Sequence, residues 1–204
     1  TPHNLGQWKH LKGVDTPENA DCIVALDTIG THALPSNLST NQQIIHFRRE
    51  PDLINRFHPL PNSKFMDYSD GTFHVINWWI SNSYDSLQTL PYSPKPKKLS
   101  TVVSAKWEHR NSFFKNLSSL IKFDAYGGYG IKDFVGSNYQ RPVKNKEDGI
   151  KDYSYSIALE NSSQQNYFTE KIADCLLLWT VPIYWGCPNI GDFFPKHSYY
   201  NIDL

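Results

Sequence analysis

The segment that decides the fold lies near the carboxyl end of the chain, where residues 155–185 read YSIALENSSQQNYFTEKIADCLLLWTVPIYW. Residues 155–159 and 181–185 are short apolar runs that predict buried strands. Residues 167–179, between them, carry apolar side chains at helical spacing and predict a helix. Strand, helix and strand in this order predict a parallel sheet covered by helices.

The predicted helix has two faces. Its polar side carries Tyr167, Glu170, Lys171 and Asp174, and it begins beyond the carboxyl end of strand 155–159, where open α/β sheets bind ligands. The unpaired amide groups of a helix start also favour a phosphate. An ordinary amphipathic helix with a charged surface shows the same spacing, so the pattern alone leaves both interpretations open. The opposite side is an apolar stripe that suits packing on the sheet, made of Phe168, Ile172, Cys175, Leu176 and Trp179.

The preceding residues continue the alternation. Residues 101–104 predict a strand and residues 110–121 a helix. Residues 123–126 lead into the glycines at 127, 128 and 130, which lack the spacing of a dinucleotide or Walker loop and predict a tight turn. A polar stretch at residues 132–152 predicts a loop.

The first half of the chain is less regular. Residues 22–26, 43–47 and 73–80 predict short buried strands. The proline- and lysine-rich stretch 90–98 predicts a linker. We therefore expect an α/β protein with two lobes, residues 1–98 and residues 99–204.

Composition excludes several classes of protein. Lys and Arg number 20 and Asp and Glu number 20, so a nucleic-acid partner has no support from net charge. No run approaches the roughly 20 apolar residues of a membrane helix. The three cysteines lack C-x-x-C spacing, which disfavours a disulfide scaffold or structural zinc, and no H-E-x-x-H pair suggests a zinc hydrolase.

Two blocks of the second half resemble the α1,3-fucosyltransferase family. Residues 159–171, which contain Leu-Glu-Asn-Ser and Thr-Glu-Lys, are followed at the family's distance by Val-Pro-Ile-Tyr-Trp-Gly at residues 181–186. Residues 103–127 are similar to the family's first donor-site block. Residues 45–51 are similar to a weaker motif of its acceptor lobe.

The resemblance implies a GT-B-type fold with two Rossmann-like lobes, a GDP-fucose donor, a glycan acceptor and inversion at the anomeric carbon. Family members continue into further helices, so the resemblance implies a second lobe that is incomplete at the carboxyl end and a first lobe that is short. Ala105 stands where family members often have Asn, so any contact of that amide is absent. The donor-binding residues that the resemblance implies are Ser104, Arg110, Asn161, Tyr167, Glu170 and Lys171.

The same resemblance places Arg110 and Lys171 at the diphosphate. Fixed cations there would stabilise the negative charge of the departing GDP. No Asp-x-Asp triplet occurs in the chain, so we expect no obligatory metal and no other cofactor. The alternative for Arg110 is a solvated residue at a helix start, where its charge opposes the helix dipole and gains nothing.

Inversion in one step needs a general base, and the acidic motif of the acceptor lobe suggests Glu50. A solvent-paired carboxylate beside Arg48 and Arg49 is an equal alternative. Asp27 and His46 are the reserve candidates.

Two other functions remain open. One is a nucleotide-sugar or glycan binding module without turnover, and the other is a transferase that uses a different GDP-sugar. No signal peptide or membrane segment is visible, so the expected protein is soluble: cytoplasmic if bacterial or viral, and a lumenal Golgi fragment if eukaryotic.

Overall fold

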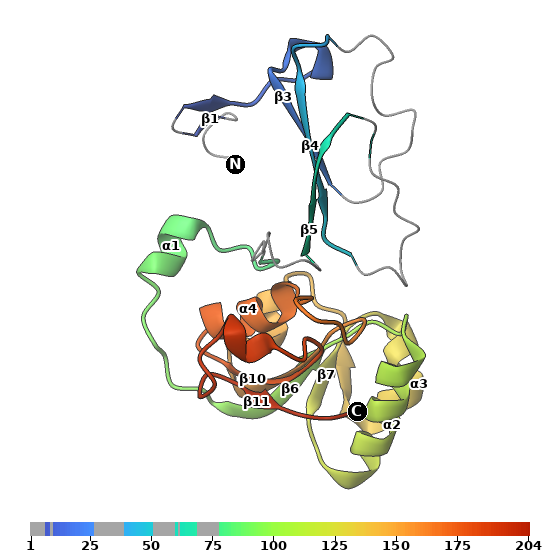
Figure 1. The fold of residues 1–204 in the computed structure, drawn as a ribbon. Helices are drawn as coiled ribbons and strands as arrows, with labels where there is room; N and C mark the ends of the chain where they lie inside the picture. Colours follow the sequence, from blue (N-terminus) through green and yellow to red (C-terminus); the bar gives the residue numbers. More distant parts are fainter. Residues whose placement is uncertain (1–6, 9, 27–38, 51–59, 61, 69–77) are drawn as a thin grey trace. The chain divides into compact units, whose positions relative to one another are not determined.

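The chain divides into two compact units, Thr1–His74 and Val75–Leu204. Figure 1 shows the fold as a computed structural model. The structure describes residues 7–8, 10–26, 39–50, 60, 62–68 and 78–204. Parallel strands form a sheet in each unit, which confirms the α/β class.

The described part of the first unit is a three-stranded parallel sheet in the order β3-β4-β5. Its strands are β3 (Cys22–Leu26), β4 (Gln43–Arg48) and β5 (Lys64–Asp67). The first two confirm the strands predicted at 22–26 and 43–47. A small antiparallel pair, β1 (Gln7–Trp8) and β2 (Leu11–Lys12), and the 3₁₀ helix η1 (Pro17–Asn19) complete it.

The second unit contains a six-stranded sheet in the order β11-β10-β9-β6-β7-β8, with every pair parallel. Read from β6 outwards, this is the 3-2-1-4-5-6 order of doubly wound α/β folds. Its strands are β6 (Lys97–Val102), β7 (Asp124–Tyr126), β8 (Tyr139–Arg141), β9 (Tyr153–Leu159), β10 (Val181–Trp185) and β11 (Tyr200–Asn201).

Helices cover both faces of this sheet (Figure 1). α2 (Glu108–Leu120) and α3 (Lys132–Val135) lie on one face and α4 (Glu170–Leu177) lies on the other, while α1 (Tyr84–Gln88) belongs to the segment that leads to β6. Ile157 of β9 packs with Phe114 of α2 in one core, while the next residue, Ala158, packs with Ile172 of α4 in the other. Because the end of β9 is buried on both faces, its last three residues, 157–159, are consecutive apolar residues.

The boundary between the units lies earlier than the predicted one after residue 98. Ile80 is buried in the α4 core with Ile150, and the backbone N–H of Trp79 donates to Asp174 Oδ1 at 2.9 Å. The predicted linker 90–98 lies within the second unit, and its last two residues begin β6. Proline and lysine disfavour regular structure but not packing, which explains the difference.

Two other predicted segments differ. Of the strand predicted at 73–80, residues 73–77 lie outside the described residues and 78–80 are irregular. The loop predicted at 132–152 contains α3, the edge strand β8 and the 3₁₀ helices η4 (Gly136–Asn138) and η5 (Lys146–Gly149). These elements are three or four residues long, too short for a periodic pattern to reveal.

The helix predicted at 167–179 is shorter at both ends. It begins at Glu170, with Thr169 as its N-cap, and ends at Leu177. Trp179 adopts the left-handed conformation that commonly ends a helix, with φ of 57°, and its side chain is 52% exposed. Trp179 is therefore not part of the apolar stripe.

Two glycines that directly follow strands combine a positive φ with a lack of room for a side chain. A Cβ at Gly127 would lie 2.0 Å from the carbonyl oxygen of Val103, and φ there is +150°. This confirms the tight turn. Gly186 follows β10 with φ of +154°, and a Cβ there would lie 2.4 Å from Cγ of the buried Glu160.

We expect Gly186→Ala to destabilise the protein by about 3 kcal/mol, because it adds an unfavourable φ to a clash with a fully buried side chain. Gly128→Ala is the matched control, since nothing lies within 4 Å of its added Cβ. Urea unfolding measures both variants. A Gly186→Ala variant as stable as Gly128→Ala would contradict the packing of Glu160 against this turn.

Candidate functional site

The sheet of the second unit has one topological switch point, between β6 and β9. From β6 the chain proceeds through β7 to β8 on one side, and from β9 it proceeds through β10 to β11 on the other. Ligands of open α/β sheets bind at the carboxyl ends of strands at such a point. Ser104 follows β6 there, and Glu160 and Asn161 follow β9.

Arg110, in the first turn of α2, joins these two strand ends. Its Nη1 donates to the carbonyl oxygen of Leu159 at 3.3 Å and to Oδ1 of Asn161 at 3.0 Å, and its Nη2 donates to Oγ of Ser104 at 3.2 Å. The residue is 4% exposed, and burial lowers the pKa of its guanidinium against the opposing effect of Glu160. Its Nε is buried and makes no hydrogen bond within the described residues.

Glu160 is a fully buried carboxylate that ties β9 to the start of α4. Its Oε1 accepts from the backbone N–H of Thr169 at 2.8 Å, and its Oε2 accepts from the Thr169 hydroxyl at 2.7 Å. Oε2 also pairs with Nζ of Lys171 at 3.0 Å. Lys171 is therefore held at the end of β9 by a carboxylate that water does not reach.

A second lysine, Lys146 of η5, lies at the same helix start. Its Nζ is 3.0 Å from Oε1 of Glu170 and 2.7 Å from Oδ2 of Asp174. Burial would lower the pKa of Lys146, but the two carboxylates outweigh it and raise the pKa. Burial would raise the pKa of Glu170, but Lys171 and Lys146 hold it below its ordinary value. For Asp174 burial prevails, and its pKa is raised.

The three cations converge on one hollow. Arg110, Lys146 and Lys171 all line a space of about 20 Å³ between the ends of β6 and β9, room for one water molecule. Lys146 and Lys171 keep 16% and 19% of their side chains exposed. Each cation has a carboxylate nearby, so the cluster carries no net charge of its own. The arrangement suits an anion that approaches the carboxyl edge of the sheet.

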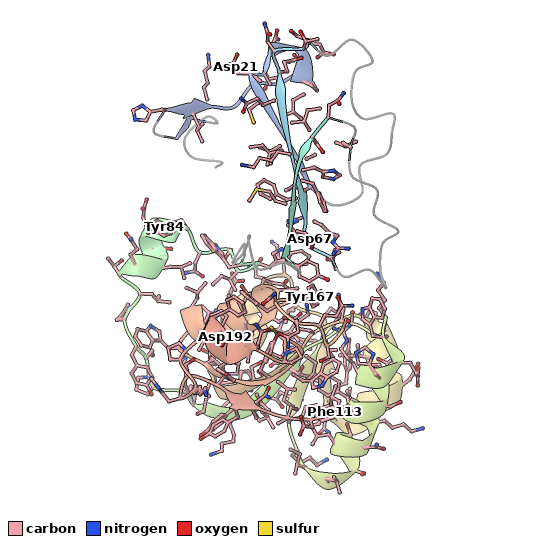
Figure 2. All side chains as sticks on the ribbon, in the orientation of Figure 1. Asp21, Asp67, Tyr84, Phe113, Tyr167 and Asp192 are labelled. Carbon is pink, nitrogen blue, oxygen red and sulfur yellow. The ribbon has the colours of Figure 1, made fainter. Side chains whose placement is uncertain are left out.

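The predicted donor-site residues lie together around this hollow. Ser104 and Asn161 contact Arg110 directly, and Glu170 lies between the two lysines. Tyr167, labelled in Figure 2, precedes α4. The prediction that it lies on the polar face of this helix is therefore wrong. Tyr167 is 1% exposed and close enough to Arg110 to affect the pKa of the guanidinium.

Two contributions were not predicted. Lys146 lies in the stretch that we expected to be a loop, and Asp174, predicted on the polar side of the helix without a role of its own, is fully buried. The i, i+4 spacing of Glu170 and Asp174 is the one available signal, because it predicts two carboxylates on one helix face. No pattern in the sequence predicts that Lys146 is the partner of both carboxylates.

The general-base candidates belong to the first unit. Glu50 is half-buried and lies two residues beyond β4. His46 is 1% exposed within β4, and its Nδ1 accepts a hydrogen bond from the backbone N–H of Leu60 at 3.2 Å. Arg48 pairs with Asp67. Asp27 lies outside the described residues.

Among the described residues, no cluster of three or more His, Cys, Asp or Glu side chains is arranged to hold a metal ion. In the same part of the chain, no helix has both the length and the apolar character needed to cross a membrane.

The strand order and the cations at the switch point define the second unit as a doubly wound α/β domain of the kind that holds nucleotides. The sequence profile of glycosyltransferase family 10 (fucosyltransferase), carboxyl-terminal part, matches residues 92–204. This is more than half of the chain, and the chain belongs to that family.

Several relatives are similar in the same region. The alpha-(1,3)-fucosyltransferase FucT of Helicobacter pylori is 36% identical over 100 residues, 46% of this chain and 20% of that protein. The human GDP-fucose protein O-fucosyltransferase 3 is 32% identical over 93 residues, 44% of this chain and 19% of that protein. The chain thus spans about a fifth of the length of these curated relatives.

A crystal structure of an α1,3-fucosyltransferase with GDP shares the fold. It is 19% identical, with a TM-score of 0.54, and the match covers 92% of this chain and 62% of that one. The predicted fold class and the predicted resemblance to fucosyltransferases are confirmed.

We expect Glu160 and Lys171 to be energetically coupled by about 1–3 kcal/mol in a double-mutant cycle of Glu160→Gln and Lys171→Met, because each single variant breaks the ion pair of a fully buried carboxylate. Asp148 and Lys151, an exposed pair at 3.1 Å, form the control cycle, with an expected coupling below about 0.5 kcal/mol. Urea unfolding measures both cycles. Equal coupling in the two would contradict the role of Glu160 as the anchor of Lys171.

Proposed function

We propose that the chain binds GDP-fucose at the switch point of the second unit and transfers fucose to an acceptor hydroxyl with inversion. The observation that carries this proposal is the convergence of Arg110 and Lys171, from different helices, on one hollow at the ends of β6 and β9. Family membership supplies the donor class. The names of the relatives include an α1,3-fucosyltransferase and a protein O-fucosyltransferase. We propose that the acceptor is a glycan and that fucose is attached to it in α1,3 linkage.

The proposed reaction breaks the bond between the fucose anomeric carbon and the diphosphate oxygen, which keeps the electron pair. The acceptor oxygen forms the new bond from the opposite face, and its proton passes to a base. Negative charge therefore accumulates on GDP, beside Arg110 and Lys171. Cations already fixed by Asn161, Ser104 and Glu160 stabilise that charge without reorganising during the step.

The contacts of these residues support their proposed roles. The hollow has room for only one water molecule, so the diphosphate would lie over it and meet the edges of the cations. The buried Nε of Arg110 is one donor that such an anion, or a bridging water, would satisfy. Asn161, Ser104 and Tyr167 surround the guanidinium, and the Glu170 carboxylate accepts hydrogen bonds from sugar hydroxyls.

Donor binding tests the proposal directly. We expect Arg110→Lys and Lys171→Met each to weaken GDP-fucose binding by about 10–100-fold, because the first removes the guanidinium with its Nε donor and the second removes an ammonium group. Lys115→Met is the matched control, an exposed lysine on the same helix as Arg110. Isothermal titration calorimetry measures all three. Unchanged affinity in both site variants would contradict the proposed donor site.

Turnover separates the remaining alternatives. Release of GDP is followed with GDP-fucose and other GDP-sugars, each with glycan and protein acceptors. Binding without turnover favours a silent binding module. Turnover only with a different GDP-sugar changes the donor and keeps the site.

We also propose that no metal or other cofactor takes part, because the two cations already stand where charge develops. GDP-fucose affinity and turnover should be the same within about twofold in excess chelator, a difference of only about 0.4 kcal/mol. A loss of turnover in chelator that added Mg²⁺ or Mn²⁺ restores would overturn this expectation.

Glu50 remains the proposed general base. We expect Glu50→Gln to lower turnover by at least about 100-fold, because proton abstraction by a positioned base contributes that much, while GDP-fucose affinity stays unchanged. Glu18→Gln, an exposed carboxylate in the first unit, controls for the loss of charge. Wild-type turnover in Glu50→Gln would end the assignment.

A further inference from the structure

We propose that Lys146 is a positioning residue for the donor: its ammonium group holds the Glu170 carboxylate in place at the switch point. The inference rests on the proposed function, in which Glu170 accepts hydrogen bonds from the nucleotide sugar. It assigns a role to a residue that lies outside both donor-site blocks of the sequence.

The ammonium group of Lys146 contacts two carboxylates at the start of α4. Glu170 and Asp174 are four residues apart, so their carboxylates lie on one helix face. The Nζ of Lys146 lies 3.0 Å from the first and 2.7 Å from the second. One ammonium group thus fixes two carboxylates on successive turns.

Lys146 is itself held from two sides. Asp174 is fully buried, and its other oxygen accepts the backbone N–H of Trp79 at 2.9 Å. The adjacent Glu147 is hydrogen-bonded to the backbone N–H and hydroxyl of Ser81, which fixes η5. The lysine therefore has little freedom to follow Glu170 if that side chain rotates, and it restrains the carboxylate instead.

The charges around Glu170 come from three elements. Lys171 and Asp174 face it from α4, with Lys171 Nζ at 3.9 Å, Lys146 faces it from η5, and Arg110 acts on it from α2. Glu160 neutralises Lys171 from the end of β9. Without Lys146, Glu170 keeps its burial, the neighbouring Asp174 and the more distant Lys171, but it loses one of the two cations that lower its pKa. Its pKa then rises, and the carboxylate takes up a proton at a higher pH.

The rise in the Glu170 pKa on loss of Lys146 distinguishes a positioning role of this lysine from a purely structural one. A lysine that only stabilises the fold changes the free energy of unfolding at every pH and leaves the pH dependence of donor binding alone. A lysine that keeps Glu170 ionised changes that dependence. GDP-fucose is the suitable probe, because both of its phosphates are esterified and lack the oxygen that titrates near pH 6 in a terminal phosphate.

The experiment measures the dissociation constant of GDP-fucose for the whole chain by calorimetry between about pH 5 and pH 8. We expect the dissociation constant of Lys146→Met, relative to that of wild type, to rise by at least about threefold from the higher pH to the lower one, because the Glu170 carboxylate takes up a proton at a higher pH in the variant. Wild type and Lys146→Arg should change by less than about twofold relative to each other over this range, since both retain the cation. His109 is common to all variants, so its titration cancels in the comparison. Lys151→Met controls for the loss of a lysine close to η5, because Lys151 is exposed and pairs with Asp148.

A second variant keeps the test decisive if Lys146→Met does not fold. Lys146→Met combined with Asp174→Asn removes one charge of each sign and keeps an oxygen for the Trp79 N–H. It should show a smaller weakening at low pH in the same direction, because the Asp174 carboxylate no longer opposes the ionisation of Glu170. The proposal is overturned if the folded single or double variant follows the wild-type pH profile. If wild type itself does not bind GDP-fucose, the proposed function fails, and that result is distinct from a wild-type profile in the variants.

Discussion

The second unit depends on a carboxylate that water does not reach. Glu160 follows β9 and is fully buried. Its carboxylate accepts hydrogen bonds from the backbone N–H and the hydroxyl of Thr169, the N-cap residue of α4. A buried carboxylate is stabilised only by such partners, so the turn between β9 and α4 has little freedom to adopt another path. Gly186 takes part in the same constraint, because only a residue without Cβ allows β10 to end against Glu160. Strand, helix and the following strand are therefore fixed by one side chain.

The same constraint shapes the electrostatics. Lys171 occupies its position because Glu160 is there, and Arg110 occupies its own because the ends of β6 and β9 supply three oxygen acceptors. Lys146 completes a cluster in which three cations face three carboxylates. Most of the free-energy cost of removing water from these cations therefore arises when the protein folds, and little of it remains for ligand binding. A diphosphate would meet donors whose directions are already set, which is the condition for electrostatic stabilisation of a leaving group.

The sequence predicts the parts of this unit whose signal is local. The strand at 181–185 coincides with β10, because a buried central strand is a continuous apolar run. The helix at 110–121 and the joint placement of Arg110 and Lys171 follow from strand–helix alternation and from the family's motifs. The end of α4 was missed, because the left-handed position that ends it holds Trp179 and not glycine. Lys146 was missed because its partners lie 24 and more residues away, a distance at which spacing carries no information.

The attachment of residues 78–82 to α4 and η5 sets the true amino-terminal edge of the nucleotide-type domain. The backbone N–H of Trp79 donates to the Asp174 carboxylate, and that of Ser81 donates to the Glu147 carboxylate. Ile80, between them, is buried in the core. All three residues precede the first strand of the sheet. A fragment that starts at β6 would keep every strand and helix of the Rossmann-type sheet, yet it would leave two acidic side chains without these partners and open a gap beside Ile150. Dissection of this family member into lobes therefore has to follow its buried hydrogen bonds, because the first regular strand starts well inside the cooperative unit.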